Sequence, residues 1–243
     1  MIKEAIQHYK QSHGYSQFSP RCVLFDMDGV LYNSMPNHAV AWHEAMKQFG
    51  IHFTADDSYA TEGARGVDTI RKYVLEQQGK EISSEEAQRM YDVKTEIFHH
   101  MPIAEIFPGV IDIMQKIKSA GMTIGVVTGS GQRPLIKRLL NDFDGFLTED
   151  HIVTAYDVER GKPNPDPYLM GLRKTGNNNP WQGIVVENAP LGVRAGSAAN
   201  CFTIGINSGP LPDSALADNG ADIVLQQMTE LCNLWDEILQ NID

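Results

Sequence analysis

At Phe25-Asp26-Met27-Asp28-Gly29-Val30, a short apolar run ends in two acids spaced two residues apart and a glycine. The run before the acids is too short for a helix and predicts a buried strand. In extended backbone, residues i and i+2 face the same side, so Asp26 and Asp28 are expected to point together. Such a pair could serve as nucleophile and acid/base, although Asp and Gly are also ordinary turn residues.

Apolar runs of the same kind recur along the chain, with helical patterns between them. They span residues 22–25, 123–127, 152–153, 184–186, 202–206 and 223–225. Each is too short for a helix, and β-branched residues are common in them. Strands that alternate with helices favour parallel βαβ units with right-handed crossovers. The sequence therefore predicts an α/β core with a doubly wound, Rossmann-like parallel sheet in residues 21–34 and 106–243.

A long insert separates the first two predicted strands. Nearly one hundred residues lie between them, far more than one crossover helix requires. Helical patterns within this insert cover residues 39–49, 68–78 and 84–99, and the last of them has a serine capping signal before Glu86. We therefore expect an all-helical cap domain over residues 35–105. The core then resumes with a predicted helix over residues 110–119.

The charge and the hydropathy of the chain argue against nucleic acid and membrane partners. The net charge is −11 with a pI near 5.1, and no run of Lys and Arg could follow a nucleic-acid backbone or an anionic membrane. Residues 1–20 are predicted to form an N-terminal extension, a short amphipathic helix and a linker. The extension has no apolar targeting segment, and no apolar stretch approaches the roughly 20 residues that span a bilayer.

The cysteines indicate a reducing environment. Cys22, Cys201 and Cys232 are odd in number, far apart, and placed in or beside apolar runs, where a reduced thiol behaves as a small hydrophobe. The sequence therefore predicts a cytoplasmic protein. An anionic substrate would have to be held by a few local cations and a metal, because the overall negative field repels it.

Polar residues also follow three later strands. Thr128-Gly129-Ser130-Gly131 follows the second strand and could hold phosphate oxygens with hydroxyl and backbone N–H groups. Lys162 lies in a proline-stiffened stretch and could neutralise a phosphoryl group, although a solvent-exposed loop lysine is the simpler interpretation. Glu187 and Asn188 follow the fourth strand and suit Mg²⁺, although Asn188 could instead cap the next helix.

These four strand ends together are more informative than any one of them. In chain order they supply a nucleophile with an acid, a hydroxyl, a cation and metal ligands, which are the parts that phosphoryl transfer requires. The sequence therefore predicts a Mg²⁺-dependent phosphate-transferring enzyme. Asp26 is the expected covalent nucleophile, and Asp28 is its expected acid/base partner.

The motifs resemble those of the haloacid dehalogenase superfamily, which correspond to Asp26-x-Asp28, Thr128, Lys162 and Glu187-Asn188 over residues 22 to about 230. The insert resembles the cap of the β-phosphoglucomutase-like branch, in which His38 and Trp42 also match. The resemblance implies that Asp26 accepts the phosphoryl group and that Asp28 protonates the leaving group and then activates water. It further implies that Thr128, Gly129 and Lys162 hold the phosphate. Mg²⁺ would lie between Asp26, the Asp28 carbonyl and the fourth motif, Glu187-Asn188.

The chain departs from the mutase pattern at two places: the first bears on metal affinity and on the exact reaction, and the second favours hydrolysis. The mutases usually carry Asp where this chain has Asn188, and Asn removes one negative charge from the metal shell. The mutases also show Gly-x-x-Arg in the cap for the substrate's distal phosphate, whereas Gly63-Ala64-Arg65-Gly66 places Arg65 one position early. A mutase needs this clamp to retain a bisphosphate intermediate while it turns round.

The chain is also similar to inorganic pyrophosphatases of this superfamily. It shares Thr61-Glu62-Gly63 and Lys94 in the cap, together with the runs at residues 126–132 and 186–190. The resemblance makes Glu62 and Lys94 the expected specificity residues, although each could also be an ordinary solvated charge. Hydrolysis of pyrophosphate or a small phosphoester ranks first. β-Phosphoglucomutase is the alternative, and a non-catalytic metabolite-binding protein ranks third because it would have little need for both Asp26 and Asp28.

Overall fold

The computed structural model describes all 243 residues and contains one six-stranded parallel sheet. The strand order is β3-β2-β1-β4-β5-β6, and every neighbouring pair is parallel. The strands are β1 (Cys22–Phe25), β2 (Thr123–Val127), β3 (Ile152–Val153), β4 (Gly183–Glu187), β5 (Phe202–Ile206) and β6 (Ile223–Leu225). All six lie where the apolar runs predict them, and only β4 is longer, by one residue at each end. The doubly wound α/β prediction is confirmed.

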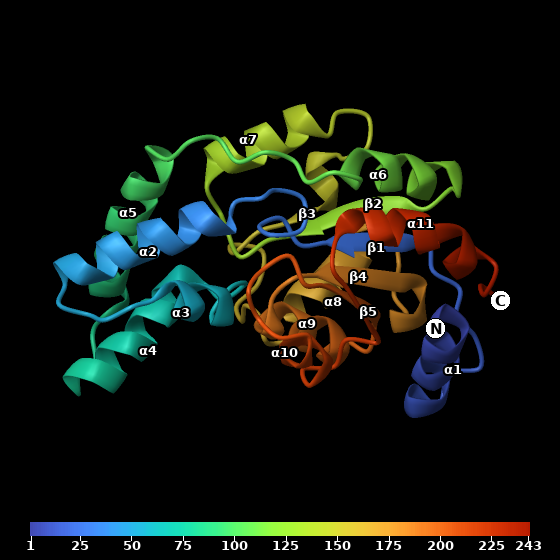
Figure 1. Cartoon of the computed structure of the whole chain (residues 1–243), viewed down its shortest axis with the longest axis horizontal. Helices are drawn as coiled ribbons and strands as arrows, with labels where there is room; N and C mark the ends of the chain where they lie inside the picture. The colour runs from blue at the N-terminus through green and yellow to red at the C-terminus, as the bar shows by residue number, and fades with distance from the viewer.

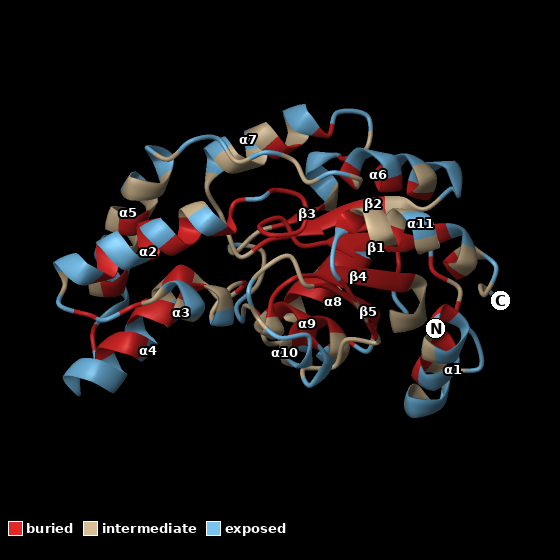
Figure 2. Cartoon of the chain, in the orientation of Figure 1, coloured by how far each residue is buried: buried red, intermediate tan, exposed pale blue.

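Helices cover both faces of the sheet because successive strand residues point to opposite sides. Val23 and Phe25 pack into a large apolar cluster on one face, while Cys22 and Leu24 pack into a smaller cluster on the other. The first face carries α6 (Val110–Ser119), α7 (Arg133–Asp142) and α11 (Met228–Leu239). The second carries α8 (Asp166–Lys174) and α9 (Pro190–Ala198), as Figure 1 shows. In Figure 2 the strands are buried and the outer helix faces are exposed.

The remaining short elements of the core connect these layers. They are α10 (Ser214–Ala217) and two single-turn 3₁₀ helices at Glu149–His151 and Pro180–Gln182. No helix anywhere in the chain combines the length and the apolar character that a bilayer crossing requires.

The insert folds as a helical cap with an apolar core of its own. Its helices are α2 (Met35–Gln48), α3 (Ala55–Ala60), α4 (Gly66–Gln78) and α5 (Ser84–His99), grouped at one side of the molecule in Figure 1. These helices and the loops between them bury a cluster of ten apolar residues, Trp42 and Phe53 among them, apart from the two core clusters. Helix α5 has the predicted bounds, whereas α2 and α4 begin earlier than predicted. Helix α3 was not predicted, although Thr54 and Asp57 form a capping box at its start.

The N-terminal extension packs on the core domain. Helix α1 (Ile2–His13) buries Ile2, Ile6 and Tyr9 in the large cluster of the sheet. The Tyr9 hydroxyl donates to the Asn200 carbonyl at 2.8 Å, and the Phe18 amide donates to Asp243 Oδ2 at 2.6 Å. In Figure 1 this helix lies near the C-terminus. Residues 1–18 thus extend the main core rather than standing apart from it.

We predict that Ile6→Ala lowers the free energy of unfolding by about 2–4 kcal/mol, because it leaves a cavity in the main core. Urea denaturation followed by circular dichroism measures this change. Gln7→Ala, on the exposed face of the same helix, is the matched control and should change stability little. Equal, small effects of the two substitutions would show that α1 adds nothing to the stability of the core.

Candidate active site

The sheet topology brings three of the four predicted motifs to one edge. Strand β1 lies between β2 and β4, and Phe25 is paired with both Val126 and Val186. Asp26, Thr128 and Asn188 follow these strands and therefore meet at their carboxyl ends. The chain also changes direction across the sheet at this point, and ligands of open α/β sheets bind in the crevice formed there.

The remaining motif reaches the same edge through Lys162, whose side chain is buried rather than solvent-exposed. Its Nζ donates to Asp26 Oδ1 at 2.5 Å, to Glu187 Oε1 at 2.6 Å and to the Val127 carbonyl at 3.0 Å. These three bonds use every proton of the ammonium group. Burial alone would lower the pKa of Lys162, but the two carboxylates raise it above its ordinary value, so the side chain stays charged.

Glu187 is the most completely bonded side chain of the site. Besides Lys162, its Oε1 accepts from the Tyr168 hydroxyl at 2.7 Å, and its Oε2 accepts from the amides of Asn188 and Ala189 at 3.0 and 3.3 Å. The sequence places Glu187 among the metal ligands. In this structure both of its oxygens accept hydrogen bonds, and Oε1 holds Lys162 in place, while the place of Glu187 among the metal ligands stays a prediction.

Two other oxygens at the edge lack partners. Asp26 Oδ2 and Asn188 Oδ1 are buried, and neither accepts a hydrogen bond. Buried oxygens without donors are costly, and a hard divalent cation with oxygen ligands would satisfy both. No three His, Cys, Asp or Glu side chains converge as a metal centre, so any cation would be held partly by the Asn188 amide and by backbone carbonyls. Asn188 does not cap α9, because Ala189 is the N-cap residue and no side chain bonds there.

The two aspartates differ in their electrostatic surroundings. Burial raises the pKa of Asp26, and Glu187 and Asp28 nearby add to this effect while Lys162 opposes it. Burial also acts on Asp28, but His38, together with a 2.6 Å hydrogen bond from the Ser34 hydroxyl, holds the pKa of Asp28 below its ordinary value. Two carboxyl groups with divergent pKa values can take different roles in one reaction.

The cap contributes a buried lysine to the site. Lys94, on α5, is 2% exposed, and its Nζ lies 2.6 Å from His38 Nδ1. The rings of Trp42 and Phe98 lie 5.2 and 4.9 Å from Nζ, within the range of cation–π attraction. Burial lowers the pKa of Lys94 to about 8, although Asp28 and Glu62 oppose this shift. Lys94 is therefore not part of a solvated helix face.

His38 connects this lysine to Asp28. Because Lys94 can only donate, Nδ1 of His38 accepts, and the ring proton is assigned to Nε2. Nε2 lies 3.2 Å from Asp28 Oδ1, which is close enough for electrostatic attraction but not aligned as a hydrogen bond. Burial and the neighbouring Lys94 lower the pKa of His38. The cap thus approaches Asp28 through a neutral imidazole.

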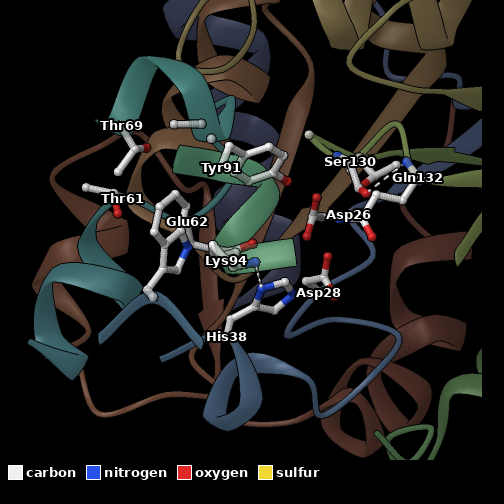
Figure 3. Close-up of a pocket in the computed structure, with 16 residues that line it drawn as sticks. Asp26, Asp28, His38, Thr61, Glu62, Thr69, Tyr91, Lys94, Ser130 and Gln132 are labelled. Atoms are coloured by element: carbon white, nitrogen blue, oxygen red, sulfur yellow. Dashed lines mark hydrogen bonds and ion pairs between the residues drawn. The ribbon is translucent and has the colours of Figure 1, made fainter. Parts of the chain in front are cut away.

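Core and cap together enclose a cavity of about 40 Å³, which is room for a few waters. Figure 3 shows Asp26 and Asp28 on one side of it and Glu62 and Lys94 on the other. Burial raises the pKa of Glu62 well above its ordinary value, and Asp28 and Asp26 add to the shift. The lining consists of Asp26, Asp28, His38, Trp42, Thr61, Glu62, Gly63, Ala64, Gly66, Thr69, Tyr91, Lys94, Thr128, Gly129, Ser130 and Gln132.

Most of the predicted site residues share this cavity or lie directly beneath it, but Arg65 does not. The guanidinium of Arg65 lies in a neighbouring cleft, away from Asp26. Conversely, Tyr91 and Ser34 were not predicted. Tyr91 precedes Lys94 by one helical turn and so shares its face, a spacing that could have indicated it. Ser34 was hidden because only the fold brings its hydroxyl to Asp28.

Comparisons with known proteins agree with this geometry. Residues 23–206 match the haloacid dehalogenase-like hydrolase family. Hexitol phosphatase A from Escherichia coli is 30% identical over 87% of this chain and 94% of its own. The β-phosphoglucomutase from Bacillus subtilis is 24% identical over 87% of this chain and 91% of its own.

The fold also matches a solved structure over its full length. A Bacteroides vulgatus protein with a provisional assignment as a β-phosphoglucomutase superposes with a TM-score of 0.95. It is 44% identical and covers 100% of this chain and 98% of its own. With phosphatases and mutases among the relatives, the chain is an enzyme of the phosphatase or phosphotransferase type. It belongs to the haloacid dehalogenase-like hydrolases, in the β-phosphoglucomutase-like branch.

Proposed function

We propose that this enzyme hydrolyses pyrophosphate or a small phosphoester through a phosphoryl group carried on Asp26. The observation that supports this proposal most strongly is the convergence of Lys94 and Glu62 from the cap on the cavity of Asp26 and Asp28. The core grips the transferred phosphate, so only the cap can meet the leaving group. A small leaving group also fits the narrow cavity with the least displacement of the cap.

In the first step an oxygen of the Asp26 carboxylate attacks phosphorus, and the bond from phosphorus to the leaving oxygen breaks. Protonated Asp28 gives its proton to that oxygen. The pKa of Asp28 is low in the free site, but the negative charge of an entering phosphate raises it, because like charges disfavour ionisation. The positive charge of Lys162 neutralises the transferred group, and Thr128, which lines the cavity, orients it.

In the second step Asp28, now a carboxylate, removes a proton from water as the water oxygen attacks phosphorus. The bond between phosphorus and Asp26 breaks, which restores the Asp26 carboxylate and releases phosphate. Lys162 is bonded to Asp26 throughout, so it fixes the orientation of the nucleophile in both steps. Asp28 therefore acts once as an acid and once as a base.

We propose Mg²⁺ as the cofactor. The free buried oxygens Asp26 Oδ2 and Asn188 Oδ1 would hold it, together with the Asp28 carbonyl oxygen. Carboxylate, amide and carbonyl oxygens are the type of ligand that Mg²⁺ prefers. When bound, the ion supplies charge neutralisation between the carboxylates and the incoming phosphate.

Interconversion of hexose 1-phosphate and 6-phosphate is the second candidate, because relatives of this chain carry the name β-phosphoglucomutase. A mutase must hold the distal phosphate of a bisphosphate intermediate. Arg65, the expected candidate for that clamp, lies outside the cavity. A coupled assay with glucose 1-phosphate tests this candidate directly: rapid formation of glucose 6-phosphate with negligible cleavage of pyrophosphate would overturn the proposal of hydrolysis.

We predict that Asp26→Asn lowers phosphate release at least about a thousandfold with an unchanged circular dichroism spectrum, because an amide is a poor nucleophile of nearly the same size. Asp28→Asn should slow release by about 10²–10⁴-fold, and most for leaving groups that require protonation. A series of phosphoesters with leaving groups of different pKa measures this dependence. Equal slowing across the series would mean that Asp28 has a structural role.

We predict that Asn188→Asp tightens Mg²⁺ binding, because it places a charged ligand where a neutral amide now stands. Isothermal titration calorimetry and the magnesium dependence of phosphate release measure the change. Asn164→Asp adds the same charge in the proline-rich loop, away from the free oxygens, and serves as the control. Unchanged magnesium affinity in Asn188→Asp would exclude Asn188 from the metal shell.

We predict that Lys94→Met costs pyrophosphate hydrolysis about tenfold or more, as the loss of one charge-assisted contact would. The pKa of Lys94 is about 8, so its charge is present below that pH and lost as the pH rises through it. Wild-type activity should therefore fall on the alkaline side near pH 8, and the variant should lack this decline.

Glu62→Ala should shift preference toward bulkier phosphoesters. If neither variant altered the choice of substrate, the cap residues would not determine specificity.

A further inference from the structure

Arg65 bridges the cap and the core outside the cavity. It is the last residue before α4, and its Nε donates to Asp68 Oδ2 in the cap at 2.8 Å. Its Nη1 donates to the Glu159 carbonyl in the core at 2.8 Å. Asp68 therefore orients the guanidinium toward the core. The two bonds come from different nitrogens of one planar group, an arrangement that a flexible ammonium could not reproduce.

The two loops joined by Arg65 fit together closely. A Cβ atom on Gly161 would lie 2.9 Å from Arg65 Cγ, and a Cβ on Gly63 would lie 3.0 Å from Lys162 Cδ. Each glycine thus leaves space that a side chain of the opposite loop occupies. Because Gly161 directly precedes Lys162, the loop that Arg65 contacts is also the one that carries the phosphate-binding lysine.

We propose that Arg65 is a closure latch: its hydrogen bond to the Glu159 carbonyl holds the cap loop of residues 61–65 against the core loop of residues 159–162. Arg65 acts as a positioning residue. It keeps Glu62, three residues before it, over Asp26 and Asp28, and it does not touch the substrate. The kinetic test of this role rests on the proposed phosphate-releasing function. The hydrogen-exchange test does not.

A latch and a substrate clamp predict different kinetics for Arg65→Ala. Loss of a latch lowers the population of the closed cap for every substrate alike. We expect kcat/KM to fall by the same factor, about three- to tenfold for one hydrogen bond, with pyrophosphate and with p-nitrophenyl phosphate. Most of the change should appear in KM. A loss confined to pyrophosphate would overturn the latch and identify Arg65 as a clamp for the second phosphate.

Gly161→Ala tests the same contact from the core side. The added methyl group would collide with the Arg65 side chain, so we expect a loss comparable to that of Arg65→Ala. In the double variant the colliding carbon atoms of Arg65 are gone, and Gly161→Ala should then have little further effect. Fully additive losses would overturn the proposal. Arg160→Ala is the matched control, because Arg160 lines the same cleft but pairs with Asp166 of its own domain and not with the cap.

Hydrogen exchange of the amides, measured by mass spectrometry on the full-length chain, reports the closed cap without any assay of turnover. A Cβ atom on Gly129 would lie 3.0 Å from the Gly63 carbonyl oxygen, so residues 129–132 of the core adjoin the cap loop and report cap closure rather than fraying of α4. We expect faster exchange there in Arg65→Ala and in Gly161→Ala, with exchange in β1 and β4 unchanged. Unaltered exchange at residues 129–132 would overturn the latch. Absence of phosphate release in the wild type would refute the proposed function alone.

Discussion

The buried ammonium of Lys162 between Asp26 and Glu187 is the interaction on which the rest of the site depends. Charges are tolerated in a protein interior only when they are paired and hydrogen-bonded, and removal of one partner leaves the others uncompensated. Lys162 comes from the loop after β3, Asp26 from the end of β1, and Glu187 from the end of β4. The ion cluster therefore requires three segments to meet at one edge of the sheet. The parallel register of β1 and β4 places its two carboxylates side by side.

The cap carries a second buried charge, arranged in a different way. Lys94 is surrounded by aromatic rings and His38, and no carboxylate bonds to it directly. Its lowered pKa shows that burial outweighs the attraction of Asp28 and Glu62. Such a group opposes folding at neutral pH and would be relieved by an incoming anion. This asymmetry between a satisfied lysine in the core and an unsatisfied lysine in the cap supports the proposal that the core holds the transferred phosphate while the cap receives a charged leaving group.

Local patterns predicted the strands and α5 because β-branched runs and apolar periodicity are read from neighbouring residues and do not depend on partners distant in the sequence. Helix α3 was missed because its sequence, Ala-Asp-Asp-Ser-Tyr-Ala, has no apolar face, and its stability comes from the capping box at Thr54. The four motifs predicted which strand ends would meet. They could not predict that Glu187 is fully bonded, that Arg65 points out of the cavity, or that α1 joins the main core. These outcomes depend on partners distant in the sequence: Tyr168 for Glu187, the Glu159 carbonyl for Arg65, and the Asn200 carbonyl for Tyr9 of α1.

The central claim is that phosphate passes through Asp26 in two displacements at phosphorus. The stereochemical course of hydrolysis tests this most directly, because each in-line displacement inverts the configuration. Hydrolysis of a chiral, isotopically labelled phosphorothioate ester in labelled water gives a product whose configuration can be assigned. A covalent intermediate predicts net retention, the result of two inversions. Net inversion would show that water attacks the substrate directly, and it would contradict the role of Asp26 as nucleophile.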